Sequence, residues 1–135
     1  MMAQVKALIG NIKGQPGKDG KDGNVNAYSE SETVIGTWNG KTLYRKVIYS
    51  PIPSSSNGEL AMVDISTGST IAAIKDITGT FTYSGKRHTF PAIVMDNSGK
   101  CARLFFAEDT KKVGIANTAP GFNSCVAEIV VEYIK

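Results

Sequence analysis

The chain has 135 residues, of which 41% are hydrophobic, and its formal net charge is +3. This composition is typical of a globular protein, and the length fits one domain with a modest extension. No apolar stretch reaches the roughly 18 residues of a membrane span, and the basic residues form no long stripe of the kind that binds nucleic acid. We therefore expect neither membrane insertion nor a nucleic-acid partner.

Residues 1–12 form a short and mostly apolar leader, which Lys6 interrupts. The apolar run is too short for the core of a signal peptide. We therefore expect the protein to be made and folded in a cytoplasm.

Residues 13–26 are polar and glycine-rich, and glycine recurs at every third position, at Gly14, Gly17, Gly20 and Gly23. A collagen triple helix requires this pattern, because only glycine fits at the axis where three polyproline II chains meet. These glycines predict trimerisation through a short collagen-like stem, with a flexible linker as the alternative. Three triplets span only about 30 Å, so the head and the leader must help to hold three chains together.

From residue 27 to residue 135 the chain alternates between apolar and polar residues at the period of a β-strand. Thr33–Trp38 and Lys41–Tyr49 flank Asn39-Gly40, the strongest short hairpin signal. The same alternation predicts four further strands, over Ala61–Ser66, Ile77–Ser84, Cys101–Ala107 and Cys125–Ile134. Besides the leader, only Thr70–Asp76 suggests a helix, and it is barely two turns long. We expect an all-β head, an antiparallel β-sandwich or jelly roll of about seven or eight strands.

Cys101 and Cys125 match no metal-binding spacing, and the chain has one histidine. We expect two small, buried and reduced strand residues, with a disulfide formed after release from a host cell as the alternative. No metal and no other cofactor is expected.

The sequence resembles the small tail-fibre or receptor-binding proteins of phages and prophages of Gram-positive and gut bacteria. The resemblance rests on Ile9–Gly14 running into the Gly-x-y triplets, on the hairpin Val34–Ile48 and on the final strand Ala127–Lys135. The hairpin is its most specific part, with Gly36-Thr37-Trp38 on one strand and Tyr44-Arg45-Lys46 on the other. The stem is shorter than many in this family.

The resemblance implies a homotrimer in the virion, attached by its leader to other tail or baseplate proteins. Its head would face outward and bind a host-surface carbohydrate. A frayed terminus is the alternative for the leader, and a purely structural tail or baseplate component is the alternative for the whole protein.

A saccharide site on a β head requires an aromatic platform with polar neighbours. The candidates are Trp38, Tyr44, Tyr49, Tyr83, Arg87, His88 and Asn123. For Trp38, packing across the hairpin is the favoured interpretation, and we expect Phe81 and Tyr83 to lie in the core. Arg45 shares a strand face with Leu43 and Val47, which suggests that it forms an ion pair at a subunit contact or lies against the stem. The alternative is that Arg45 lies on an edge strand, where its charge would prevent pairing with other chains.

Catalysis is not expected. Glycan cleavage needs two carboxylates about 5 to 9.5 Å apart, and the only recognisable pair is Glu108-Asp109, which we expect in a turn beside Lys111 and Lys112. With a single histidine and no nucleophile elbow, the sequence offers no serine hydrolase site.

Overall fold

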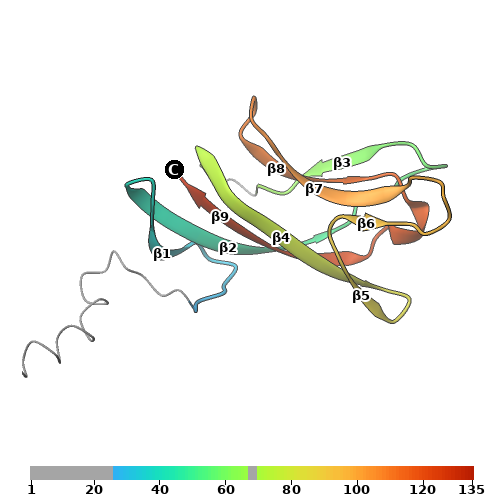
Figure 1. The fold of residues 1–135 in the computed structure, drawn as a ribbon, viewed down its shortest axis with the longest axis horizontal. Coiled ribbons are helices and arrows are strands. Elements are labelled where there is room, and N and C mark those ends of the chain that lie inside the picture. Colours follow the sequence, from blue (N-terminus) through green and yellow to red (C-terminus); the bar gives the residue numbers. More distant parts are fainter. Residues whose placement is uncertain (1–25, 67–69) are drawn as a thin grey trace, which may run out of the picture.

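The computed structural model describes residues 26–66 and 70–135, which form nine strands in two antiparallel sheets without an α-helix (Figure 1). The predicted leader and the stem glycines Gly14, Gly17, Gly20 and Gly23 lie outside the described residues. No helix in the described part is long and apolar enough to cross a membrane.

Sheet A has five strands, and β9 is its central strand. In spatial order they are β1 (Thr33–Trp38), β2 (Lys41–Pro51), β9 (Val126–Ile134), β4 (Ala73–Tyr83) and β5 (Lys86–Thr89). Sheet B has four strands, in the order β3 (Ala61–Asp64), β8 (Lys112–Asn117), β7 (Cys101–Ala107) and β6 (Ala92–Ile93). A 3-10 turn, η2 (Pro120–Phe122), leads from β8 towards β9.

Two tight turns connect the hairpins β1–β2 and β4–β5 of sheet A. Asn39 and Gly40 both have positive φ, 52° and 75°, as the predicted type I′ turn between β1 and β2 requires. Ser84 and Gly85 repeat this conformation between β4 and β5, with φ of 53° and 74°. The two hairpins therefore follow from local turn chemistry.

The two sheets pack face to face around one main core. The alternation predicted for the last strand is confirmed, because its odd-numbered residues Ala127, Ile129, Val131 and Tyr133 are at most 1% exposed. Strand β2 places Tyr44 and Ile48 on the same side of sheet A, and sheet B contributes Ala102, Val113 and Ile115. The inner face of sheet A is thus the side that carries the odd-numbered residues of β9.

A second apolar cluster lies on the outer face of sheet A, around Ile35, Leu43 and Ile134. Trp38 and Ala73 pack against this cluster. Trp38 therefore packs on its own hairpin and on the end of β9, as the favoured interpretation expects.

The helical suggestion for Thr70–Asp76 is wrong, because β4 begins at Ala73 and pairs with the end of β9. Tertiary pairing decides such a short segment, since an isolated helix of two turns is unstable. Tyr83 is also wrongly placed by the sequence: it is 38% exposed, because β4 reaches beyond the region that sheet B covers.

The sequence gives no alternation over β8, because both faces of this strand are covered. Ala116 is 1% exposed although it points outward, and the ring of Phe105 lies directly over Gly114. The segments β5, β6 and β8 raise the number of strands above the seven or eight expected.

Candidate functional site

The structure divides the predicted site residues into three groups. His88 lines a pocket at one end of the sandwich together with Tyr83, and Tyr49 and Arg87 lie on the outer face of sheet A. The other three, Trp38, Tyr44 and Asn123, pack against or hydrogen-bond with other residues of the head.

Asn123 holds two loops together. Its side-chain oxygen accepts hydrogen bonds from the backbone N–H of Ser55 at 2.7 Å and from the Asn117 amide at 3.1 Å, and its amide donates to the Ser55 carbonyl at 2.9 Å. Tyr44 is half-buried, and its ring stacks on that of Tyr133 with the centroids 5.9 Å apart. These contacts use the polar and aromatic groups that the sequence offers to a ligand.

The end pocket lies at the opposite end of the sandwich from the residues where the described chain begins (Figure 1). The β4–β5 hairpin, the segment after β6 and η2 form its walls, and its volume is about 300 Å³. We call it the distal pocket; it is lined by Tyr83, His88, Ile93, Val94, Met95, Asp96, Lys100, Ala119, Pro120, Gly121 and Phe122.

Aromatic rings form one side of the distal pocket. Phe122 is buried, and its ring meets the ring of Tyr83 edge-on at 5.2 Å. The His88 ring stacks on Phe81 at 5.5 Å and lies 6.0 Å from Phe122. His88 is therefore held in place by core aromatics and presents a fixed ring to the pocket.

The rim of the distal pocket is partly apolar and partly charged. Met95 is 96% exposed and Ile93 is 60% exposed, both unusually high for large apolar side chains. Hydrogen bonds from Ser98 hold the pKa of Asp96 below its usual value, so Asp96 is a carboxylate acceptor, and Lys100 supplies a donor on the same rim. Aromatic and apolar side chains beside a hydrogen-bond acceptor and a donor are suited to a sugar ring.

On the outer face of sheet A, Glu128 joins two of the predicted residues. The Tyr49 hydroxyl donates to one carboxylate oxygen at 2.8 Å, and Arg87 donates to the other at 3.1 Å. The hydrogen bond to Glu128 raises the pKa of Tyr49, because it stabilises the protonated phenol. Next to Tyr49 is a recess of about 620 Å³ that Tyr28, Ser29, Glu30, Val47, Glu128 and Val130 complete.

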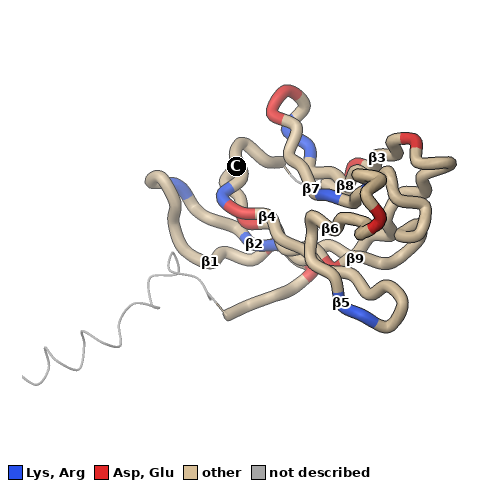
Figure 2. Tube along the Cα trace, turned by 45° about the vertical axis from the view of Figure 1, so that its right-hand side comes forward, with Lys and Arg blue, Asp and Glu red and all other residues tan. Residues whose placement is uncertain are grey.

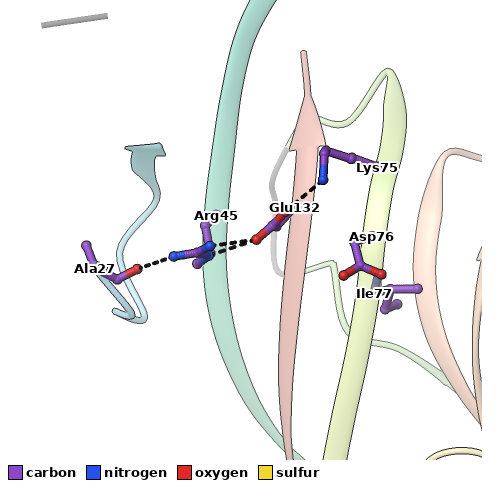
Figure 3. Close-up of polar contacts among 6 residues, drawn as sticks. All are labelled: Ala27, Arg45, Lys75, Asp76, Ile77 and Glu132. Carbon is purple, nitrogen blue, oxygen red and sulfur yellow. Dashed lines mark hydrogen bonds and ion pairs between the residues drawn. The ribbon is translucent and has the colours of Figure 1, made fainter. Parts of the chain in front are cut away.

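Further along the same face, Arg45 forms an ion pair within the chain. Its guanidinium donates to Glu132 at 2.7 and 3.0 Å, and Lys75 approaches the other carboxylate oxygen at 3.6 Å (Figure 3). The expectation of an edge strand is wrong, because β2 lies between β1 and β9. Arg45 also donates to the Ala27 carbonyl at 3.1 Å, so it contacts the residues that directly follow the predicted stem.

Charged residues of both signs are interspersed along the described trace (Figure 2). Within the described ranges, no group of three or more His, Cys, Asp and Glu side chains could hold a metal ion. Cys101 and Cys125 are free and half-buried. Glu108 lies in the β7–β8 turn, as expected, and it forms an ion pair with Lys111 at 3.1 Å.

Comparisons with protein-family models, curated proteins and solved structures found no match for this chain.

Proposed function

We propose that this chain is the non-enzymatic receptor-binding subunit of a phage tail fibre, and that three heads bind a host-surface carbohydrate through their distal pockets. The observation that carries the proposal is the place of the pocket, at the end of the sandwich opposite to where the described chain begins. A fibre attached through its N-terminal segment would present this end to the cell. The resemblance of the hairpin and the last strand to phage receptor-binding proteins supports the same assignment.

The chemistry of the pocket supports a saccharide ligand. Tyr83 and His88 offer ring surfaces, and sugar rings carry C–H groups that pack on such surfaces. Asp96 can accept hydrogen bonds from hydroxyl groups, and Lys100 can donate to ring or carboxylate oxygens. We expect weak binding by one pocket and strong binding by three, because linked sites act at a high effective concentration.

An array of bacterial surface polysaccharides, probed with the labelled full chain, tests this function. The test variant is Met95→Asp, which changes an almost fully exposed side chain on the rim, and the control is Met62→Asp, at a 60% exposed position on β3. We expect Met95→Asp to lower binding at least tenfold while Met62→Asp binds like the unchanged chain. Bound saccharides should be recovered at their original length, since no cleavage is expected.

A purely structural tail component is the competing proposal. It predicts that no polysaccharide on the array is bound, or that Met95→Asp and Met62→Asp bind equally well. Either result would refute a receptor site in the distal pocket.

A further inference from the structure

The point at which the chain reaches the head is fixed by the Arg45–Glu132 ion pair. Arg45 is 7% exposed, and its guanidinium carbon lies 4.2 Å from the centre of the Tyr28 ring. Figure 3 shows the hydrogen bond to the Ala27 carbonyl. Together with the ring contact, it holds residues 27 and 28 over the outer face of sheet A. The chain that precedes Ala27 therefore starts from this face.

The distance to the last stem glycine is short. Four residues lead from Gly23 to Ala27, and four residues span at most about 14 Å in any conformation. The outer face of sheet B lies on the far side of a sandwich roughly 20 Å thick, since sheets pack about 10 Å apart and side chains project from both outer faces. If three chains meet at Gly14–Gly23, sheet A is therefore the sheet that can face their common axis.

The outer face of sheet A is also suited to being covered. Four of its charges are paired within the chain, since Arg87 binds Glu128 and Arg45 binds Glu132, so a covering subunit would bury these as ion pairs. Glu30 at the recess and Asp76 on β4 are exposed carboxylates that a basic side chain of the neighbouring copy could pair with. On the same face of β9, Val130 lies between Glu128 and Glu132, and Val126, which is 60% exposed, lies next to Glu128. Tyr28 and Tyr49 are 62% and 52% exposed, and tyrosine is enriched in protein interfaces.

We propose that the outer face of sheet A is the surface through which each head contacts a second copy of this chain around the stem axis. The recess of about 620 Å³ between Tyr28 and Tyr49 receives a side chain of the neighbouring copy. Tyr49 and Arg87 then serve the contact between subunits, and the saccharide is left to the distal pocket. This inference rests on the trimer of the proposed function, but it assigns a different surface.

The test measures the mass of the full chain by light scattering and sedimentation over a range of concentrations. Val126→Arg and Thr78→Arg each place a charge on the exposed part of this face, and Met62→Arg is the matched control on the other sheet. We expect a trimer for the unchanged chain and for Met62→Arg. Both arginine variants on sheet A should raise the dissociation constant at least tenfold and give monomers at micromolar concentration, with unchanged circular dichroism.

A monomeric unchanged chain, or arginine variants on sheet A that remain as trimeric as the Met62→Arg control, would overturn the inference. If one sheet A variant fails to fold, the other decides. The polysaccharide array reports separately on the distal pocket. A trimer that dissociates in the sheet A variants but binds no saccharide would support this interface and refute the proposed function. A chain that binds saccharide but is not a trimer would support the distal pocket and refute this interface.

Discussion

The ion pair between Arg45 and Glu132 gives the sharpest prediction about stability. The two side chains are only 9% and 15% exposed, and two charge-assisted hydrogen bonds join them. In Arg45→Met the aliphatic volume is kept, while Glu132 remains shielded from water with the Lys75 ammonium 3.6 Å from its carboxylate and Asp76 opposite it on β4. Removing one partner of a buried pair typically costs 3–5 kcal/mol, and the remaining Lys75 places this case at about 3 kcal/mol.

The double variant Arg45→Met/Glu132→Leu separates the value of the pair from the cost of a lone buried charge. Replacement of both partners by apolar residues is often neutral, so we expect most of the lost stability to return. Lys75 is 41% exposed and remains solvated in the double variant. The free energies of unfolding come from urea denaturation, followed by circular dichroism at one protein concentration.

Two results would refute this reasoning. A loss below about 0.5 kcal/mol for Arg45→Met would mean that the pair behaves like an exposed one. A double variant as unstable as Arg45→Met would mean that the loss comes from the missing contacts to Ala27 and Tyr28, and not from the charge left on Glu132.

Three further changes test the packing, the loop contacts and the pH dependence. Gly114→Ala should lower the stability by about 1–3 kcal/mol, because a Cβ would lie 2.8 Å from the Val63 carbonyl oxygen, and an unchanged melting temperature would contradict this. Asn123→Ala should lower the free energy of unfolding by about 1–3 kcal/mol, because Ser55 and Asn117 lose a hydrogen-bond partner. The variant should still bind saccharide at a temperature where it is folded. Lost binding with unchanged stability would instead make Asn123 a ligand residue. Burial raises the pKa of Glu32, but hydrogen bonds from Lys135 and Tyr133 outweigh it and hold the pKa below its usual value. Because that pKa is lower in the folded state, the stabilisation is present above the unfolded value of about 4.3 and is lost as the pH falls through the folded value. Glu32→Gln should therefore flatten the fall in stability below about pH 5, and a pH profile parallel to that of the unchanged chain would contradict this assignment.

Much of the strand pattern could be predicted because it depends on local signals. The Asn39-Gly40 turn and the apolar face of β9 are confirmed, since turn conformation and period-two alternation act within a few residues. Strand β8 could not be found in this way, because Phe105 covers Gly114 on its outer face and removes the alternation.

The site residues could be predicted by type but not by place. Tyr49 and Arg87 are far apart in the sequence, and Glu128 on β9 brings them together. Glu128 lies in the predicted last strand, but nothing in the sequence marks it as the partner of both residues. The distal pocket depends on Met95 and Phe122, which come from loop and turn segments without a periodic pattern.

Binding of the labelled full chain to a panel of bacterial cells, before and after periodate oxidation, tests the central claim most directly. Periodate cleaves the vicinal diols of surface saccharides and leaves most protein receptors intact. We predict that the unchanged chain binds some strains and that periodate treatment of the cells abolishes this binding. The Met95→Asp variant should not bind these strains, whereas Met62→Asp should bind them like the unchanged chain. Binding that survives periodate but is lost after protease treatment of the cells, or no binding to any strain, would contradict a saccharide receptor.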